Sequence, residues 1–142
     1  PSGATGFNEN GVRHQVENIG DKPINILLIE HKNVSSLLKL NPEDNLSPEI
    51  VFPDKCEVLF ENDMLKVLES TLPVGESNAM HEHGAYAVYF SSGGNLEITS
   101  PDGGKQEKTF ADYATGFSKV PVRHKAKNIG DTDIKTLIMQ YK

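Results

Sequence analysis

A chain of 142 residues with 37% hydrophobic and 24% charged residues has the size and composition of one ordinary globular domain. Its 20 Asp and Glu outnumber its 14 Lys and Arg, so the formal net charge is 14 − 20 = −6, which argues against nucleic acid and anionic membranes as partners. The single cysteine excludes an intramolecular disulfide framework, and no apolar run approaches the roughly 20 residues of a membrane span. No signal peptide is visible; the compartment stays open, with the cytoplasm slightly favoured.

The first 32 residues are repeated at the end of the chain. A shift of 110 positions aligns residues 1–32 with residues 111–142 without a gap, and 14 of the 32 pairs are identical, among them the blocks ATGF, VRH and NIGD. Identity at this level indicates an internal duplication. Because only the later copy follows a long strand-rich sequence, we predict that residues 1–32 are the C-terminal part of a preceding module.

Half a module would leave strands without partners, and two outcomes would relieve this. In one, the strands expected around Val12–Val16 and Ile24–His31 add to a sheet of the complete module, in the same chain or in another copy. In the other, the chain is a fragment of a longer two-module protein. The two are compatible, and we expect a homodimer formed by strand exchange.

Residues 33–52 are expected to form a connector, because they are rich in proline and polar residues, with one helical turn near Ser35–Leu40. The complete module, residues 53–142, contains short strand-like runs separated by turn residues: CEVLFE, MLKVLESTL, AYAVYF, NLEITS, KQEKTF, VPVRHKAKN and IKTLIMQYK. Many short strands without helical periodicity predict an all-β antiparallel sandwich or barrel.

Two tight turns are expected within this module. The sequence PDGG joins two strands as a hairpin, in which Pro101 presets the turn and the glycines tolerate positive φ. The sequence NIGD joins the last two strands. There Asn128 is expected to satisfy turn backbone groups, and Gly130 to adopt positive φ.

Three histidines form the constellation with the clearest chemistry. His81 and His83 are two residues apart, and alternate residues of a strand point to the same side, so both can face one centre. His124, on a later strand, can join them inside a small barrel. Three imidazoles suit Zn²⁺, Fe²⁺, Mn²⁺, Ni²⁺ or Cu²⁺ and leave positions open for a ligand. The sequence therefore predicts a divalent transition-metal site at His81, His83 and His124.

The spacing of these residues resembles the two sequence motifs of the cupin superfamily: Gly75, five residues, His81, one residue, His83, and later His124, three residues and Asn128. The resemblance covers residues 53–142 fully, and residues 1–32 resemble the second-motif end of another cupin module. It implies a cupin-type jelly-roll β-barrel, or double-stranded β-helix, with extra N-terminal strands. Cupins include dioxygenases, isomerases, lyases, decarboxylases, sugar-binding domains and storage proteins, so the resemblance implies no single activity.

One position departs from the family pattern. In metal-binding cupins a Glu usually follows the second histidine by four or five positions, where this chain has Ala87 and Val88. Loss of an anionic ligand weakens metal affinity, although three neutral histidines are enough for a catalytic zinc. Two interpretations therefore stay open. One is a three-histidine metal site that binds or transforms a small organic molecule; the other is a metal-free small-ligand-binding or structural cupin without catalytic activity.

Four further residues are candidates for a ligand pocket above the histidines. Met80, Tyr86 and Tyr89 would supply an apolar wall, and Arg123 could hold a ligand carboxylate. The alternatives are packing in the barrel wall for the first three and a structural role for Arg123, because Arg13 occupies the matching place in the first copy. No side chain stands out as a catalytic base.

Overall fold

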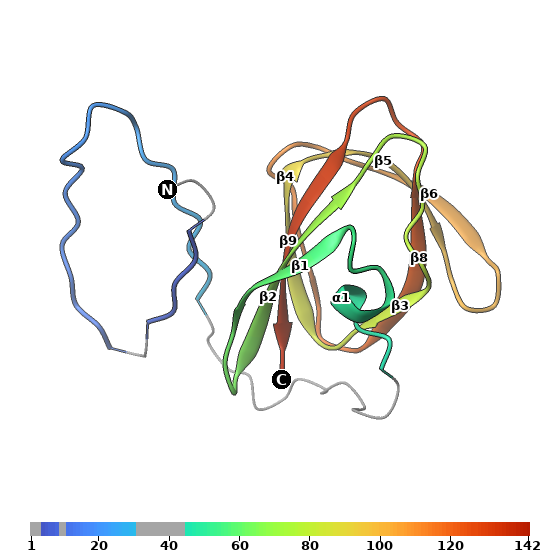
Figure 1. The fold of residues 1–142 in the computed structure, drawn as a ribbon, viewed down its shortest axis with the longest axis horizontal. Helices are drawn as coiled ribbons and strands as arrows, with labels where there is room; N and C mark the ends of the chain where they lie inside the picture. Colours follow the sequence, from blue (N-terminus) through green and yellow to red (C-terminus); the bar gives the residue numbers. More distant parts are fainter. Residues whose placement is uncertain (1–3, 9–10, 31–44) are drawn as a thin grey trace.

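The structure is a computed structural model that describes residues 4–8, 11–30 and 45–142. These residues contain one short helix and nine strands, which all lie after residue 47 (Figure 1): α1 (Pro48–Val51), β1 (Cys56–Glu61), β2 (Leu65–Leu72), β3 (His81–His83), β4 (Tyr86–Ser92), β5 (Gly94–Thr99), β6 (Lys105–Phe110), β7 (Thr115–Ser118), β8 (Val122–Asn128) and β9 (Ile134–Tyr141). Within the described ranges, no helix is long and apolar enough to cross a membrane.

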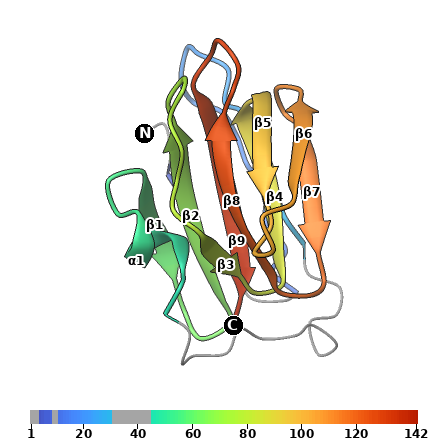
Figure 2. The ribbon, with the colours of Figure 1, turned by 90° about the vertical axis from the view of Figure 1, so that its right-hand side faces the viewer.

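The nine strands form two antiparallel sheets that face each other. One has the strand order β1-β2-β9-β4-β7 and the other the order β3-β8-β5-β6. Figure 2 shows β8, β5 and β6 in front, with strands of the five-stranded sheet behind them. Neighbours such as β2 and β9 are far apart in sequence, and consecutive strands such as β4 and β5 lie in different sheets. This connectivity is that of a jelly roll, so the predicted fold class is confirmed.

The apolar core fills the space between the sheets as two clusters. The residues of these clusters lie at alternate positions of their strands, as Ile134 and Ile138 do on β9 and Leu68 and Leu72 on β2. The first cluster consists of Leu72, Phe90, Leu96, Ala126 and Ile134. The second lies at the end of the barrel that carries α1 and consists of Phe52, Cys56, Leu68 and Ile138. Residues 45–52, expected to belong to the connector, therefore begin the folded body, and Phe52 is part of its core.

Both predicted turns are present. In the PDGG turn the backbone N–H of Ser100 donates to Gly104 O at 2.9 Å, and Gly103 has a φ of +86°. In the NIGD turn Asn128 satisfies the backbone, as expected. Gly130, however, does not have positive φ. A glycine fits there for another reason: a Cβ would lie 3.2 Å from the backbone nitrogen of Asn95, a tight contact that the neighbouring backbone would have to relieve.

The N-terminal segment does not form the strands that were expected of it. Residues 4–8 and 11–30 contain no strand, whereas strands were expected around Val12–Val16 and Ile24–His31. The helical turn expected near Ser35–Leu40 falls outside the described residues. Two contacts join the N-terminal segment to β1: Thr5 Oγ1 donates to Leu59 O at 3.4 Å, and the rings of Phe7 and Phe60 stack with centroids 6.1 Å apart.

Candidate metal centre

Strand pairing brings the three predicted histidines together. His81 and His83 lie on β3 and point to the same side, while β8 runs antiparallel beside β3 with His124 directly opposite His81. One ring nitrogen from each histidine lies within 4.8 Å of the others. Among the described residues this cluster contains no carboxylate, which agrees with the absence of the usual Glu from the motif.

The centre lies inside the barrel beneath aromatic side chains. His81 and His83 are only 2% and 3% exposed, and His124 is half-buried. The Phe52 and His81 rings pack in a T-shaped arrangement with centroids 4.9 Å apart, and the Tyr86 ring lies 4.7 Å from that of His83. Water is thus largely excluded, so charges and lone pairs in the centre act through a low dielectric.

Hydrogen bonds orient the two most buried rings. His81 Nδ1 lies 2.9 Å from Ala79 O, and His83 Nδ1 lies 2.7 Å from the amide oxygen of Gln140. Because both partners are acceptors, each Nδ1 carries the ring proton and each Nε2 keeps a lone pair. The two Nε2 atoms lie 3.0 Å apart. Two lone pairs at this distance repel each other unless a cation lies beside them.

Burial also determines the charge of the rings. It lowers the pKa of His81, and burial together with the neighbouring His81 and His124 lowers the pKa of His83 to about 3. Burial, His81 and the cation of Lys108 lower the pKa of His124 to about 4. All three imidazoles are therefore neutral at pH 7, which is the form that binds metal ions. Because the pKa values of His81 and His83 are lowered, a proton shared between their Nε2 atoms is not favoured at pH 7, whereas a metal ion could bind to both.

Gln140 is a site residue that the sequence interpretation missed. It lies on β9 opposite Tyr86 of β4, is buried, and reaches His83 from the opposite sheet. The available signal was the alternation of the last strand, which places Gln140 on the same side as the buried Ile134 and Ile138. A polar side chain on an otherwise apolar face is the exception that calls for an explanation.

The four predicted pocket residues do not all face the histidines. Tyr86 does, and Met80 is half-buried next to β3. Tyr89 follows Tyr86 by three positions and lies on the outer face of the sheet, with its ring 6.3 Å from that of Tyr113.

Arg123 also points away from the centre, because it is the neighbour of the inward-facing His124 on the same strand. Its Nε and Nη2 lie 2.9 Å from a carboxylate oxygen of Glu82, the residue directly opposite on β3. Arg123 therefore joins β3 to β8 on the outside of the barrel rather than reaching a ligand beside the histidines.

We compared the sequence and the fold with those of known proteins. No protein-family model and no curated protein sequence matches the chain. Among solved structures, a cupin domain from Bordetella pertussis Tohama I is similar, with a TM-score of 0.56 and 24% identity over 61% of this chain and 91% of that chain.

Two further solved structures are similar at lower scores. A cupin superfamily protein from Desulfitobacterium hafniense has a TM-score of 0.47 at 17% identity, over 61% of this chain and 74% of its own. A cupin family protein with a double-stranded β-helix fold from Methanocaldococcus jannaschii has a TM-score of 0.48 at 13% identity, over 77% and 92%. At these identities the likeness concerns the fold alone. This chain has the fold of the cupin superfamily, as its two histidine motifs predict.

Proposed function

We propose that this protein binds one divalent transition-metal ion through a ring nitrogen of each of His81, His83 and His124, and that it binds or transforms a small organic molecule there. The observation that carries the proposal is the 3.0 Å distance between the Nε2 atoms of His81 and His83 in a buried site, where both Nδ1 atoms face oxygen acceptors. A metal ion would relieve the repulsion between them and use both lone pairs.

The donor set fits such an ion. Neutral imidazoles suit Zn²⁺, Fe²⁺, Mn²⁺, Ni²⁺ or Cu²⁺, and three of them leave coordination positions open. The ion would supply Lewis acidity or, for iron, oxygen activation. Tyr86 next to His83 would act as a hydrogen-bond donor to the bound molecule, because burial raises the pKa of its phenol and keeps it protonated.

The charges around the centre favour an anionic ligand atom. Three neutral histidines leave the full positive charge of the ion, and Lys108 on β6 adds a cation that acts on His124. A carboxylate or enolate oxygen would complete this arrangement better than a neutral group. We therefore infer that the small molecule carries an anionic oxygen.

Metal-free binding of a small anion by the histidines themselves is the rival. It would need at least one imidazolium, and the lowered pKa values of His83 and His124 make this form scarce at neutral pH. A purely structural cupin is the other alternative. Either becomes the preferred interpretation if no metal binds.

The test is metal binding by the full chain after chelator treatment. We expect one Zn²⁺ or Co²⁺ per chain by mass spectrometry and Co²⁺ absorption, and at least about a 100-fold loss of affinity in His83→Gln, since a missing ligand costs more than an outer-shell change. His14→Ala is the matched control, because His14 is the repeat counterpart of His124 but is exposed. Absence of uptake by wild-type protein with a native circular dichroism spectrum would contradict the proposal.

A further inference from the structure

The histidine centre is covered more completely on one side than on the other. Phe52, which follows α1, packs on His81, and both His81 and His83 are buried. His124 on β8 is only half-buried. In the same sheet β8 is followed by β5 and then by β6, the last strand of that sheet (Figure 2). We therefore expect a molecule that binds at the centre to approach from the side of His124, where β5 and β6 continue the sheet.

Strand β6 turns a lysine towards this approach. Phe110, the last residue of β6, stacks on Phe90 of the opposite sheet with ring centroids 4.2 Å apart, so its side chain lies inside the barrel. Lys108 precedes Phe110 by two positions and is paired with the buried Leu96, so it faces the same side. Lys108 and Gln106 are nevertheless exposed. Side chains that face the inside of a barrel and still reach water lie at its mouth.

The strands around this mouth do not neutralise the charge of Lys108. Strands β4, β7, β8 and β9 contain no Asp or Glu, and Glu97 of β5 and Glu107 of β6 are paired on the outer face of the sheet. Lys105, on that outer face, forms a 3.0 Å ion pair with Glu97. Lys108 forms no ion pair with any residue that the structure describes. It therefore presents an uncompensated cation at the mouth.

The charge of Lys108 also acts on the centre. After burial and the neighbouring His81, the cation of Lys108 is the next cause that lowers the pKa of His124. A divalent ion bound to three neutral histidines would add its own positive charge to the same space. Such an arrangement favours a ligand that brings one anionic group to each cation, because complementary charges determine which ligands bind.

We propose that Lys108 is a specificity-determining residue of this centre, and that it selects small molecules with a second anionic group, a carboxylate or a phosphate. The inference rests on the proposed function: one anionic oxygen of the molecule binds to the metal, and the second group accepts a hydrogen bond from the ammonium of Lys108. A lysine ammonium is a compact cation that binds carboxylate and phosphate oxygens alike. Molecules with a single anionic group would leave it without a partner.

Binding of simple anions to the Co²⁺-loaded full chain tests the proposal, with the Co²⁺ absorption spectrum as the readout. Succinate and 3-phosphonopropionate carry a second anionic group, a carboxylate and a phosphonate, and butyrate is the matched molecule without one. We expect wild-type protein to bind at least one dianion at least about 10-fold more tightly than butyrate, as a charge-assisted hydrogen bond provides. The order of the two dianions identifies the preferred group.

Three variants assign this preference to Lys108. Lys108→Gln should weaken binding of the preferred dianion to the level of butyrate, about 10-fold, and change butyrate binding by less than about 3-fold. Lys108→Arg keeps the cation and should keep the preference. Lys105→Gln, the same change on the outer face of the same strand, should leave all three dissociation constants unchanged.

Two results would overturn this inference alone. In one, neither dianion binds to wild-type protein more tightly than butyrate. In the other, Lys108→Gln weakens dianions and butyrate equally, which would mean that Lys108 acts only through its field at the metal. Failure of folded wild-type protein to bind Co²⁺, which is measured before any anion is added, would instead overturn the proposed function and this inference with it. Circular dichroism checks that each variant is folded.

Discussion

The amide oxygen of Gln140 accepts a hydrogen bond from Nδ1 of His83 at 2.7 Å, and this contact joins the two sheets of the barrel at the centre of the site. It keeps the ring proton of His83 on Nδ1 and turns Nε2 towards His81. Because the acceptor is a neutral amide, it orients the ring without adding negative charge. Gln140 is thus a positioning residue whose effect is exerted through His83.

Replacement of Gln140 should change metal affinity in opposite directions for two variants. Gln140→Leu removes the acceptor, and we expect affinity to fall by about 10- to 100-fold, the usual cost of losing an outer-shell partner. Gln140→Glu supplies a carboxylate that makes His83 a more basic ligand, so affinity should rise. Competition with a coloured chelator measures both.

The split between these variants separates a positioning role from a structural one. Thermal unfolding of the metal-free proteins should show both variants folded. If Leu and Glu at position 140 lowered metal affinity equally, Gln140 would be packing against His83 rather than orienting it.

Asn128 should be among the most sensitive positions for stability. Its buried side chain donates to Leu72 O at 2.9 Å and to Thr132 O at 2.8 Å, and it accepts the N–H of Gly130 at 3.0 Å. Asn128→Ala would leave these groups without partners in a dry environment, and we expect a loss of about 2 to 4 kcal/mol in the free energy of unfolding. Urea denaturation measures it.

The repeat provides a matched control. Asn18 makes the corresponding turn, donating to Lys22 O at 2.8 Å and accepting the N–H of Gly20 at 3.0 Å, but it is exposed. Asn18→Ala should change the free energy of unfolding by less than about 0.5 kcal/mol. Equal losses for the two variants would mean that the turn, and not burial, determines the effect.

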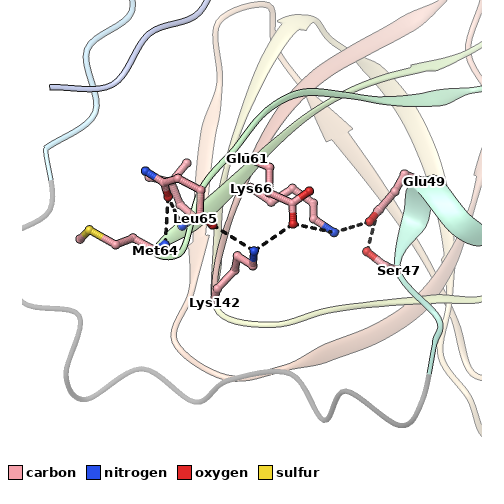
Figure 3. Close-up of polar contacts among 8 residues, drawn as sticks. Ser47, Glu49, Glu61, Met64, Leu65, Lys66 and Lys142 are labelled. Atoms are coloured by element: carbon pink, nitrogen blue, oxygen red, sulfur yellow. Dashed lines mark hydrogen bonds and ion pairs between the residues drawn. The ribbon is translucent and has the colours of Figure 1, made fainter.

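A polar cluster attaches α1 to the end of the barrel (Figure 3). Glu49 of α1 accepts hydrogen bonds from Ser47 and from Lys66 of β2, while Glu61 lies near both Lys66 and Lys142. Since α1 precedes Phe52, this cluster helps to hold the Phe52 ring against His81. Glu49→Gln should lower the free energy of unfolding by about 1 to 2 kcal/mol at pH 7, because it weakens a half-buried charged hydrogen bond.

The effect of Glu49→Gln should depend on pH. Burial by itself raises the pKa of Glu49, but hydrogen bonds from Lys66 and Ser47 outweigh it and hold the pKa below its usual 4.5. A lowered pKa contributes stability above the pKa of the unfolded chain and loses it as the pH falls through the folded value. The difference between wild type and variant should therefore shrink below about pH 4.5.

Glu97 serves as the control for this prediction. It forms a 3.0 Å ion pair with Lys105, whose side chain is largely exposed, so Glu97→Gln should cost less than about 0.5 kcal/mol at any pH. A Glu49→Gln effect that is equally small, or that grows on acidification, would show that the cluster does not stabilise α1.

Local periodicity was sufficient for much of the fold. The alternation of HEH predicted that His81 and His83 share a side, and the turn residues of PDGG and NIGD marked two real turns. Alternation also shows why two pocket residues were misplaced: Tyr89 lies three positions after Tyr86, and Arg123 lies next to His124, so both face outward. The positive φ expected for Gly130 came from turn statistics. In the structure Gly130 instead lies close to the backbone of Asn95.

The sequence by itself determined the all-β class, the likeness of residues 1–32 to residues 111–142 and the three histidines of the centre, because these depend on spacing along the chain. The tertiary structure decided that Gln140 orients His83 and that Phe52 covers His81. Those relationships join residues from strands far apart in the chain. They follow from sheet order and register, which short-range patterns do not encode.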